Sequence, residues 1–317
     1  MKSTAIANSN IAFVKYWGKK DYELNIPSNP SISMTLDENL STKTTVEFDE
    51  KYTEDLFILN DEICFGVKLN RVSKFLDIVR KKAGIRQYAK VMSVNTFPTA
   101  SGIASSASGF CALALAGSKA AGLELEKKEL SALARQGSGS AARSVHGGFV
   151  FWKDKFATEI KNKEHWPELR DVIIILSQKE KKTSSRKGMK ITAEKSKLYK
   201  KRQKKIKKTL ENVKKYLHKK NFSKLAKEIM DDSDNMHDCI NEAGINYLTK
   251  ESLKLKKKII KLNKKETIAA YTFDAGPNMH IITLEKHLPI IEKEFKDYKK
   301  ILSGTGKGAR LTEEHLF

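Results

Sequence analysis

A run of small residues from Pro98 to Gly109 is the part of the chain best suited to bind a phosphate. It lies between a β-like segment and an Ala-rich one, so its backbone N–H groups are expected to converge at a helix N-terminus, where anions bind. Glycine and alanine let a phosphate approach the main chain, and Ser105 and Ser106 add hydroxyl donors. The run lacks the Gly-Lys-Ser/Thr ending of a Walker A sequence. A helix start built only for tight packing would look similar, so other residues must decide.

Three further clusters place polar groups at the ends of apolar segments. Residues 10–21 join an apolar strand to Lys15 and to aromatic side chains. Residues 137–144 offer serine hydroxyls and the Arg143 guanidinium to an anion, from a turn and the helix start beyond it. Residues 271–278 set Asp274 at the end of an apolar strand, just before a Gly-Pro turn. Taken singly, each group has a structural explanation as a turn cap, a surface lysine or an ion-pair partner.

Taken in order, the four motifs resemble those of the diphosphomevalonate decarboxylase family, within the GHMP kinase superfamily. They read Asn-Ile-Ala…Lys-Tyr-Trp-Gly-Lys, Pro-Thr-Ala-x-Gly-x-Ala-Ser-Ser, Gly-Ser-Gly-Ser-Ala-x-Arg-Ser and Tyr-Thr-Phe-Asp-Ala-Gly-Pro-Asn, and they span nearly the whole chain. Residues 181–189 resemble the family's mobile loop over the active site. The phosphate-binding run alone indicates the superfamily, whereas the first and last motifs indicate the decarboxylase branch. Departures from the family pattern at residues 7–9 and 279–280 do not touch the reacting groups.

The resemblance implies an enzyme that phosphorylates the 3-hydroxyl of mevalonate 5-diphosphate with ATP and then expels phosphate and CO2, giving isopentenyl diphosphate. Departure of phosphate develops positive charge at C3, so the site must align groups and stabilise charge. Carried over by motif, Asp274 would orient or deprotonate the hydroxyl, and Lys15 would steady the phosphoryl group. Arg143, helped by Asn10, would bind the substrate carboxylate.

The other assignments also follow from the resemblance. Magnesium is expected to be carried on the ATP phosphates with few protein ligands, because no acidic pair with metal spacing appears in the sequence. Lys182 and Ser185 would close over the site as part of a lid. A homodimer is implied, without nucleic-acid or membrane partners. The diphosphate tail would be bound by Tyr16, Lys19, Ser138, Ser140, Ser185 and Arg186, and ATP by Asn95, Pro98, Gly102, Ala104, Ser105, Ser106 and Lys182.

The elements that must position these groups can be read from apolar periodicity and from Gly, Pro and Asn signals. The opening 60 residues alternate β-like runs with turn residues, and the Ala-rich segment after the phosphate-binding run predicts a closely packed, buried helix. Strands are predicted over 32–36, 42–48, 90–94 and 147–152, and helices over 68–84, 105–122 and 127–136.

Composition shifts near Trp166-Pro167, and an apolar strand over 171–177 is expected to open a second domain. Seventeen lysines between 179 and 220 alternate with apolar residues at helical spacing, which predicts one long amphipathic helix with a solvated lysine face. The resemblance implies an α+β chain with the GHMP kinase fold. Residues 1–170 would form a ribosomal-protein-S5-domain-2-like domain with the phosphate loop, and residues 171–317 a ferredoxin-like α/β sandwich domain carrying the aspartate.

The net charge of +22 favours binding to polyanions in principle. However, only nine of the 60 basic residues are arginine, the side chain that base recognition prefers, and a lysine-rich proteome or a heat-adapted host gives the same bias. Two alternatives stay open beside the decarboxylase. One is a sister enzyme that converts mevalonate 5-phosphate to isopentenyl phosphate, and the other is a lysine-rich RNA-binding protein with a relic nucleotide site.

The polar N-terminus and the short apolar runs predict neither a signal peptide nor a membrane span, so a cytoplasmic location is expected. Three widely separated cysteines form neither a disulfide framework nor a metal site and are expected to be free thiols. His146, His237 and His280 belong to none of the motifs and are expected to be structural.

Overall fold

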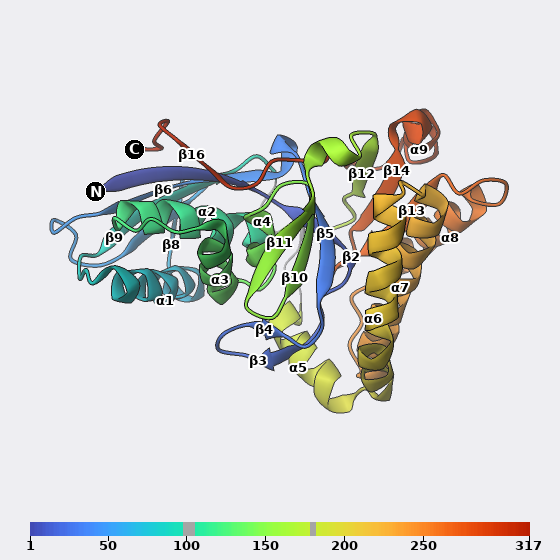
Figure 1. Ribbon diagram of the computed structural model, residues 1–317, viewed down its shortest axis with the longest axis horizontal. Helices are drawn as coiled ribbons and strands as arrows, with labels where there is room; N and C mark the ends of the chain where they lie inside the picture. The colour runs from blue at the N-terminus through green and yellow to red at the C-terminus, as the bar shows by residue number, and fades with distance from the viewer. Residues whose placement is uncertain (98–104, 178–181) are drawn as a thin grey trace.

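The computed structural model describes residues 1–97, 105–177 and 182–317, which form three main sheets with helices packed against them. Figure 1 shows the first sheet with α1, α2 and α3 at one end of the molecule and helices α6, α7 and α8 at the other. The sheet that holds β2, β5, β10 and β11 stands between them. The α+β class predicted from the sequence is confirmed. In the part of the chain that the structure describes, no helix is long and apolar enough to cross a membrane.

The first sheet has the order β16-β1-β6-β9-β7-β8, with one parallel pair, β7 and β9, in an otherwise antiparallel arrangement. Helices α1 and α2 share a buried apolar cluster with its strands. The sheet comprises β1 (Lys2–Asn8), β6 (Ser41–Phe48), β7 (Leu56–Leu59), β8 (Glu62–Cys64), β9 (Ala89–Asn95) and β16 (Arg310–Thr312), covered by α1 (Gly66–Ala83), α2 (Ser105–Ala120) and α3 (Lys127–Gly137).

The second sheet has the order β11-β10-β5-β2 and the third the order β13-β14-β12-β15, both antiparallel. A short hairpin, β3 (Lys19–Asp21) with β4 (Ile26–Pro27), follows β2. The second sheet comprises β2 (Asn10–Val14), β5 (Ser31–Thr35), β10 (Phe149–Lys153) and β11 (Phe156–Lys161), and the third β12 (Leu169–Ile174), β13 (Ala269–Phe273), β14 (Met279–Leu284) and β15 (Lys300–Gly304).

The long lysine-rich helix predicted from residue 179 onward is wrong, because two helices occupy this region. Ser196 separates them: its N–H donates to Thr192 at 3.0 Å, and its hydroxyl accepts from Tyr199 N at 3.0 Å, capping the second helix. The helices of this half are α5 (Ser185–Lys195), α6 (Lys197–His218), α7 (Phe222–Glu242), α8 (Lys250–Leu262) and α9 (Leu288–Glu294), and a one-turn helix, α4 (Ala141–Ser144), precedes β10.

The other predicted elements are confirmed with small shifts at their ends. The strand expected over 171–177 starts at Leu169 and stops at Ile174, because the amides that follow Ile175 leave the ladder. Leu176 N and Ser177 N donate instead to the Asn278 side-chain oxygen, at 2.7 and 3.0 Å. The helix over 105–122 is α2, which ends at Ala120 and is buried as predicted.

A large apolar cluster joins the two halves of the chain. Ile11 and Phe13 of β2 and Phe149 of β10 belong to the same buried cluster as residues of α6, α7 and β12. Helices α6 and α7 therefore lie against the second sheet as well as the third. This packing brings the end of β2 next to the end of β13, about 260 residues apart in sequence, at the point where the candidate site is formed.

Candidate active site

Lys15 and Asp274 form an ion pair between the two halves of the chain. Lys15 directly follows β2, which carries a bulge between Ala12 and Val14, a feature that redirects the chain at the end of a strand. Its Nζ lies 2.7 Å from Asp274 Oδ1. The lysine side chain is 3% exposed and that of the aspartate 33%, so the carboxylate is the partner that solvent or a substrate can reach. The structure thus brings together two residues that the sequence assigned to one reaction.

Arg143 is buried beside this pair at the end of the one-turn helix α4. Its Nε donates to Asn10 Oδ1 at 2.9 Å, and one terminal nitrogen donates to the Ser31 hydroxyl at 2.9 Å. Burial lowers the pKa of the guanidinium to about 10, against the opposing effects of Asp274 and Tyr16. Arg143 is therefore still a cation at neutral pH. Two of its five N–H donors are occupied by Asn10 and Ser31, and this orientation leaves the others for an anion.

Asn10 connects the Arg143 guanidinium to the polar groups of Ser140 and Ser144. While its oxygen accepts from the guanidinium, its Nδ2 donates to the Ser144 hydroxyl at 2.8 Å and to Ser140 O at 3.2 Å. Ser31, on β5, was not predicted as a site residue because its neighbours in sequence form no motif. Its role follows only from the pairing of β2 with β5.

Three cations from separate segments face one another next to the hairpin β3–β4. Burial, together with the charges of Arg186 and Arg71, lowers the pKa of Lys19 to about 8. The pKa of Arg71, on α1, is lowered by burial and by Arg186. Among the residues that the structure describes, these cations have no carboxylate partner within salt-bridge distance. Like charges held together in this way would be stabilised by a polyanion.

Arg71 was missed by the sequence analysis, which assigned Lys19 and Arg186 but not this residue. It lies in α1, a helix whose apolar residues Val72, Phe75, Leu76 and Val79 give no hint of a ligand. Its guanidinium also stacks on the Phe110 ring, 4.9 Å from the ring centroid. Nothing in the local sequence marks it, because its neighbours in the site come from β3 and α5.

Tyr16 lies between Arg143 and helix α2, together with the turn that contains Ser138 and Ser140. The Tyr16 ring packs edge-on against Trp152, with centroids 4.7 Å apart, and burial raises the pKa of its hydroxyl. That hydroxyl has no hydrogen-bond partner among the described residues. Ser138 Oγ lies 3.3 Å from Ser140 Oγ and 3.3 Å from Ser106 Oγ. The turn therefore connects the predicted tail-binding residues with the start of α2.

The predicted ATP-binding residues are only partly covered by the structure. Ser105 and Ser106 begin α2, with Ser106 exposed, as expected for hydroxyls at an anion-binding helix start. Asn95 ends β9 and accepts a hydrogen bond from the Thr42 hydroxyl at 2.7 Å. Three predicted residues, Pro98, Gly102 and Ala104, lie outside the described residues.

Helix α5 carries the predicted lid residues. Ser184 caps it, accepting from Lys187 N at 3.3 Å, so Ser185 and Arg186 occupy its first turn. Lys182 is exposed just before the helix. Figure 1 shows α5 beside the hairpin β3–β4, consistent with the electrostatic coupling of Arg186 to Lys19.

Gly188 lets α5 approach the site closely. Trp17 and Tyr247 pack against each other with ring centroids 6.1 Å apart, and α5 lies over them. A Cβ on Gly188 would overlap the Tyr247 hydroxyl and lie 3.3 Å from the Trp17 ring. Trp17 of the first motif is 2% exposed. Its role here is to support α5, and through it the position of Arg186.

The backbone conformation at residue 18 requires a glycine. Its φ of 92° is unfavourable for other residues, and a Cβ there would overlap the Tyr199 hydroxyl. The turn from Trp17 to Lys19 is thereby fixed against α6, which places Lys19 in the cationic group.

The histidines, cysteines and carboxylates of the described ranges form no cluster suited to a metal ion. Over residues 1–97, 105–177 and 182–317 no three His, Cys, Asp or Glu side chains converge in a way that could hold a metal ion. The three cysteines are free and buried. His146 bonds Ala157 O at 2.9 Å and His280 bonds Asp171 at 2.7 Å, so each ring has a partner outside the motifs.

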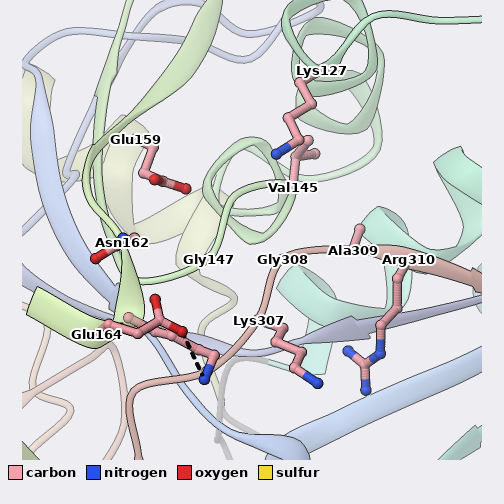
Figure 2. Close-up of a pocket in the computed structure, with 12 residues that line it drawn as sticks. Lys127, Val145, Gly147, Glu159, Asn162, Glu164, Lys307, Gly308, Ala309 and Arg310 are labelled. Atoms are coloured by element: carbon pink, nitrogen blue, oxygen red, sulfur yellow. Dashed lines mark ion pairs between the residues drawn. The ribbon is translucent and has the colours of Figure 1, made fainter. Parts of the chain in front are cut away.

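A separate hollow, shown in Figure 2, contains none of the predicted site residues. It is lined by both charge signs, including Lys127, Lys307 and Glu159, and Lys163 pairs with Glu164 across 3.1 Å. The mixture of signs and the absence of any motif residue among its lining distinguish it from the Lys15–Asp274 region.

Comparisons with known proteins cover nearly the whole chain. Residues 7–162 match the family model for the diphosphomevalonate decarboxylase-like N-terminal domain, and residues 171–313 match that for the mevalonate 5-diphosphate decarboxylase C-terminal domain. A diphosphomevalonate decarboxylase of Candida albicans is 39% identical over 320 residues, covering 92% of this chain and 88% of the relative.

Solved structures give the same result. The crystal structure of mevalonate diphosphate decarboxylase from Staphylococcus aureus superposes with a TM-score of 0.94 at 36% identity, covering 98% of both chains. A structure of MDDEF in complex with MVAPP, AMPPCP and magnesium has a TM-score of 0.93 at 37% identity, covering 99% of both chains. The fold is thus shared over nearly the whole chain.

Proposed function

The chain belongs to the diphosphomevalonate decarboxylase family, and from this premise we infer which of its residues perform each part of the reaction. It is an enzyme that decarboxylates mevalonate 5-diphosphate with consumption of ATP, and it uses ATP and Mg²⁺. The products are isopentenyl diphosphate, ADP, phosphate and CO2. The observation that carries the assignment of residues is the 2.7 Å contact between Lys15 and Asp274.

Asp274 is proposed to receive the substrate 3-hydroxyl. Its carboxylate is the exposed member of the pair, so it can accept the hydroxyl proton or orient it as the oxygen attacks the terminal phosphorus of ATP. Lys15 neutralises the carboxylate and offers an ammonium to the oxygens of the transferring phosphoryl group. The C3–O–P bond forms as the bond between the terminal phosphorus and the ADP oxygen breaks.

Arg143 is proposed to bind the substrate carboxylate for the second step. Loss of phosphate from C3 takes the C–O electron pair with the leaving group, and the C–CO2 bond supplies the electrons of the new double bond. A guanidinium oriented by Asn10 and Ser31 can hold that carboxylate in line with the breaking bond.

The cations Lys19, Arg71 and Arg186 are proposed to bind the diphosphate tail, together with Tyr16, Ser138, Ser140 and Ser185. Their mutual repulsion without a substrate supports this, because a bound polyanion would relieve it. Placing the tail here puts the rest of a substrate between Arg143 and the Lys15–Asp274 pair.

ATP is proposed to bind at the start of α2, with Asn95, Pro98, Gly102, Ala104, Ser105, Ser106 and Lys182 as its contacts. The Ser105 and Ser106 hydroxyls, in the first turn of α2, would share a magnesium ion with ATP phosphates, and a hydroxyl and phosphate environment suits an ion that keeps much of its water. When bound, the ion neutralises phosphate charge.

The direct test supplies purified protein and Mg-ATP with mevalonate, its 5-phosphate and its 5-diphosphate in parallel, measuring ADP and CO2. Equal ADP and CO2 from the 5-diphosphate is the expected result. Preference for the 5-phosphate would favour the sister enzyme, and ADP without CO2 a kinase. No turnover of any of the three, together with salt-sensitive RNA binding, would contradict the assignment and favour the RNA-binding alternative.

Three further features are proposed. Division into domains 1–170 and 171–317 is supported by the separate family models over 7–162 and 171–313. A cytoplasmic location is supported by three free, buried cysteines, which are typical of a reducing compartment. A homodimer without nucleic-acid or membrane partners remains a prediction from the family resemblance, which sedimentation at several protein concentrations would test.

A further inference from the structure

Both main-chain polar groups of Lys15 are bonded to residues outside its own sheet. Beyond the bulge in β2, Lys15 N donates to Asp232 Oδ2 of α7 at 2.7 Å. Lys15 O accepts from Arg202 of α6 at 3.2 Å and from Asn29 at 2.9 Å. The backbone of the lysine is therefore fixed by side chains from two helices of the other half of the molecule.

Asp232 and Arg202 form a fully buried ion pair behind the site. Asp232 Oδ1 lies 2.9 Å from a terminal nitrogen of Arg202, and the side chains are 1% and 2% exposed. Arg202 also donates to Asn235 Oδ1 at 3.0 Å and to Asp232 O at 3.3 Å. A buried pair of this kind is weak evidence for stability, because desolvation opposes the attraction between the charges. Its bonds to the main chain of Lys15 point instead to a role in positioning that residue.

Helix α7, which carries Asp232, also holds β13, the strand that leads to Asp274. β13 is the edge strand of its sheet, so the outward-facing amides of this strand need partners from elsewhere. Phe273 N, one residue before Asp274, donates to the Ser233 hydroxyl at 3.0 Å. The ring of His237, one turn along α7, packs at right angles to the Phe273 ring, with centroids 6.1 Å apart.

Adjacent residues of α7 thus bond the main chain of Lys15 and that of Phe273, the residue before Asp274. We propose that Asp232, with Arg202, and Ser233 are positioning residues that set the 2.7 Å contact by fixing the main chains of Lys15 and Phe273. This inference rests on the function proposed for Lys15 and Asp274. It assigns part of the catalytic geometry to residues that do not contact a reacting atom.

The chain offers a matched control for the ion pair. Asp55 also binds an arginine through both oxygens, Arg80 at 2.9 and 3.0 Å, and also accepts a main-chain amide, Ala89 N at 2.9 Å. This second pair is nearly buried too, at 5% and 10% exposure of the side chains, but none of its contacts involves a site residue. Asp55→Asn therefore repeats the chemical change of Asp232→Asn away from the reacting centre.

The experiment compares Tm, kcat and the KM values for ATP and mevalonate 5-diphosphate in the two variants. Both are expected to lower Tm, because each leaves a buried arginine without its full counter-charge. Only Asp232→Asn is expected to lower kcat, by about 10- to 100-fold, since misplacement of a catalytic group by about 1 Å can cost about 100-fold in rate. Both KM values should stay within about threefold, because the binding groups are not touched.

A second comparison does not depend on charge. Ser233→Ala removes the acceptor for Phe273 N, and Ser303→Ala removes an equally buried hydroxyl that accepts from Asp37 N at 3.0 Å, far from the motifs. The former is expected to lower kcat about fivefold or more and the latter to leave it unchanged.

Equal kcat in Asp232→Asn and Asp55→Asn, or in Ser233→Ala and Ser303→Ala, would overturn the inference. If Asp232→Asn does not fold, the double variant Asp232→Leu with Arg202→Met replaces the pair by apolar side chains, and wild-type kcat in that protein would overturn it as well. Turnover by the unmodified enzyme separates the two proposals: without it the proposed function fails, whereas normal variants of an active enzyme contradict only the positioning role.

Discussion

Two neighbouring regions differ in how their charges are compensated. One is the centre formed by Lys15, Asp274 and Arg143, and the other is the cationic group of Lys19, Arg71 and Arg186. In the centre, each charge has a fixed partner: Lys15 contacts Asp274, and Arg143 is oriented by Asn10 and Ser31. In the cationic group, burial and mutual repulsion lower pKa values, and among the described residues no carboxylate compensates them. In the first arrangement the charges already have their partners before substrate binds. In the second, the negative charge of the substrate supplies the missing partner.

The largest effect is expected from Asp274→Asn, which removes the charged acceptor from the prepared centre. Turnover should fall by about 10³-fold or more, because the amide cannot accept the hydroxyl proton and no longer pairs with Lys15. ATP affinity should be nearly unchanged. ADP and CO2 release and a nucleotide-binding titration measure the two properties.

Asp231→Asn is a suitable control for that variant, since this aspartate pairs with Lys227 on the exposed side of α7. It should retain wild-type turnover. Normal ADP and CO2 release by Asp274→Asn would contradict the role given to the central carboxylate.

A smaller but still large effect is expected from Arg143→Lys, which keeps the charge and loses the planar fork. The kcat/KM for mevalonate 5-diphosphate should fall about 100-fold, since one ammonium nitrogen cannot replace the separate guanidinium nitrogens that bond Asn10 and Ser31 and leave a planar edge for a carboxylate. The KM for ATP should change by less than about threefold. Steady-state kinetics with each substrate varied in turn would show whether orientation, rather than charge alone, matters in this centre.

The cationic group can be tested through pH. Burial, Arg186 and Arg71 lower the pKa of Lys19 to about 8, so Lys19 loses its proton as pH rises through 8, and kcat/KM for the diphosphate substrate should fall there. Arg71→Met should lower kcat/KM about 10-fold. It should also raise the pKa of Lys19, because a repelling cation is removed, and so move the alkaline fall to higher pH.

Arg86→Met provides the control, because this arginine is exposed beyond the end of α1. It should leave both the affinity and the pH profile unchanged. A shift of the Arg71→Met profile toward lower pH would contradict the proposed coupling with Lys19.

The smallest effect is expected from Gly188→Ala, which tests how the lid helix supports the cationic group. The added methyl would overlap the Tyr247 hydroxyl and should displace α5, and Arg186 with it. The KM for mevalonate 5-diphosphate should rise about fivefold, with kcat little changed. In Gly117→Ala, where the nearest atom would lie 3.9 Å away, neither parameter should change.

Sequence analysis could single out candidate residues that stand at the ends of regular elements. Lys15 after an apolar strand and Asp274 before a Gly-Pro turn are recognisable locally, and their contact was implied by the shared motif pattern. The fold class and most helices and strands could be predicted for the same reason, since the apolar period is local.

Residues that act through long-range convergence could not be predicted in this way. Arg71 and Asp232 lie within ordinary amphipathic helices, and only the packing of those helices brings them to the site. The break at Ser196 was missed because a serine cap in a lysine-rich stretch looks like any solvated position until Tyr199 N and Thr192 O are seen to bond it.

The pairing of β1 with β16 has a consequence for biosynthesis. Thr4, Ala5 and Ile6 pair with residues 310–312, near the opposite end of the printed sequence. On the ribosome, β1 can pair with β6 early, but its other edge stays open until residues 310–312 have been translated. An unpaired edge invites pairing with other nascent chains. Heterologous production should therefore benefit from slow synthesis or chaperones, and any C-terminal fusion should leave β16 free to join the sheet.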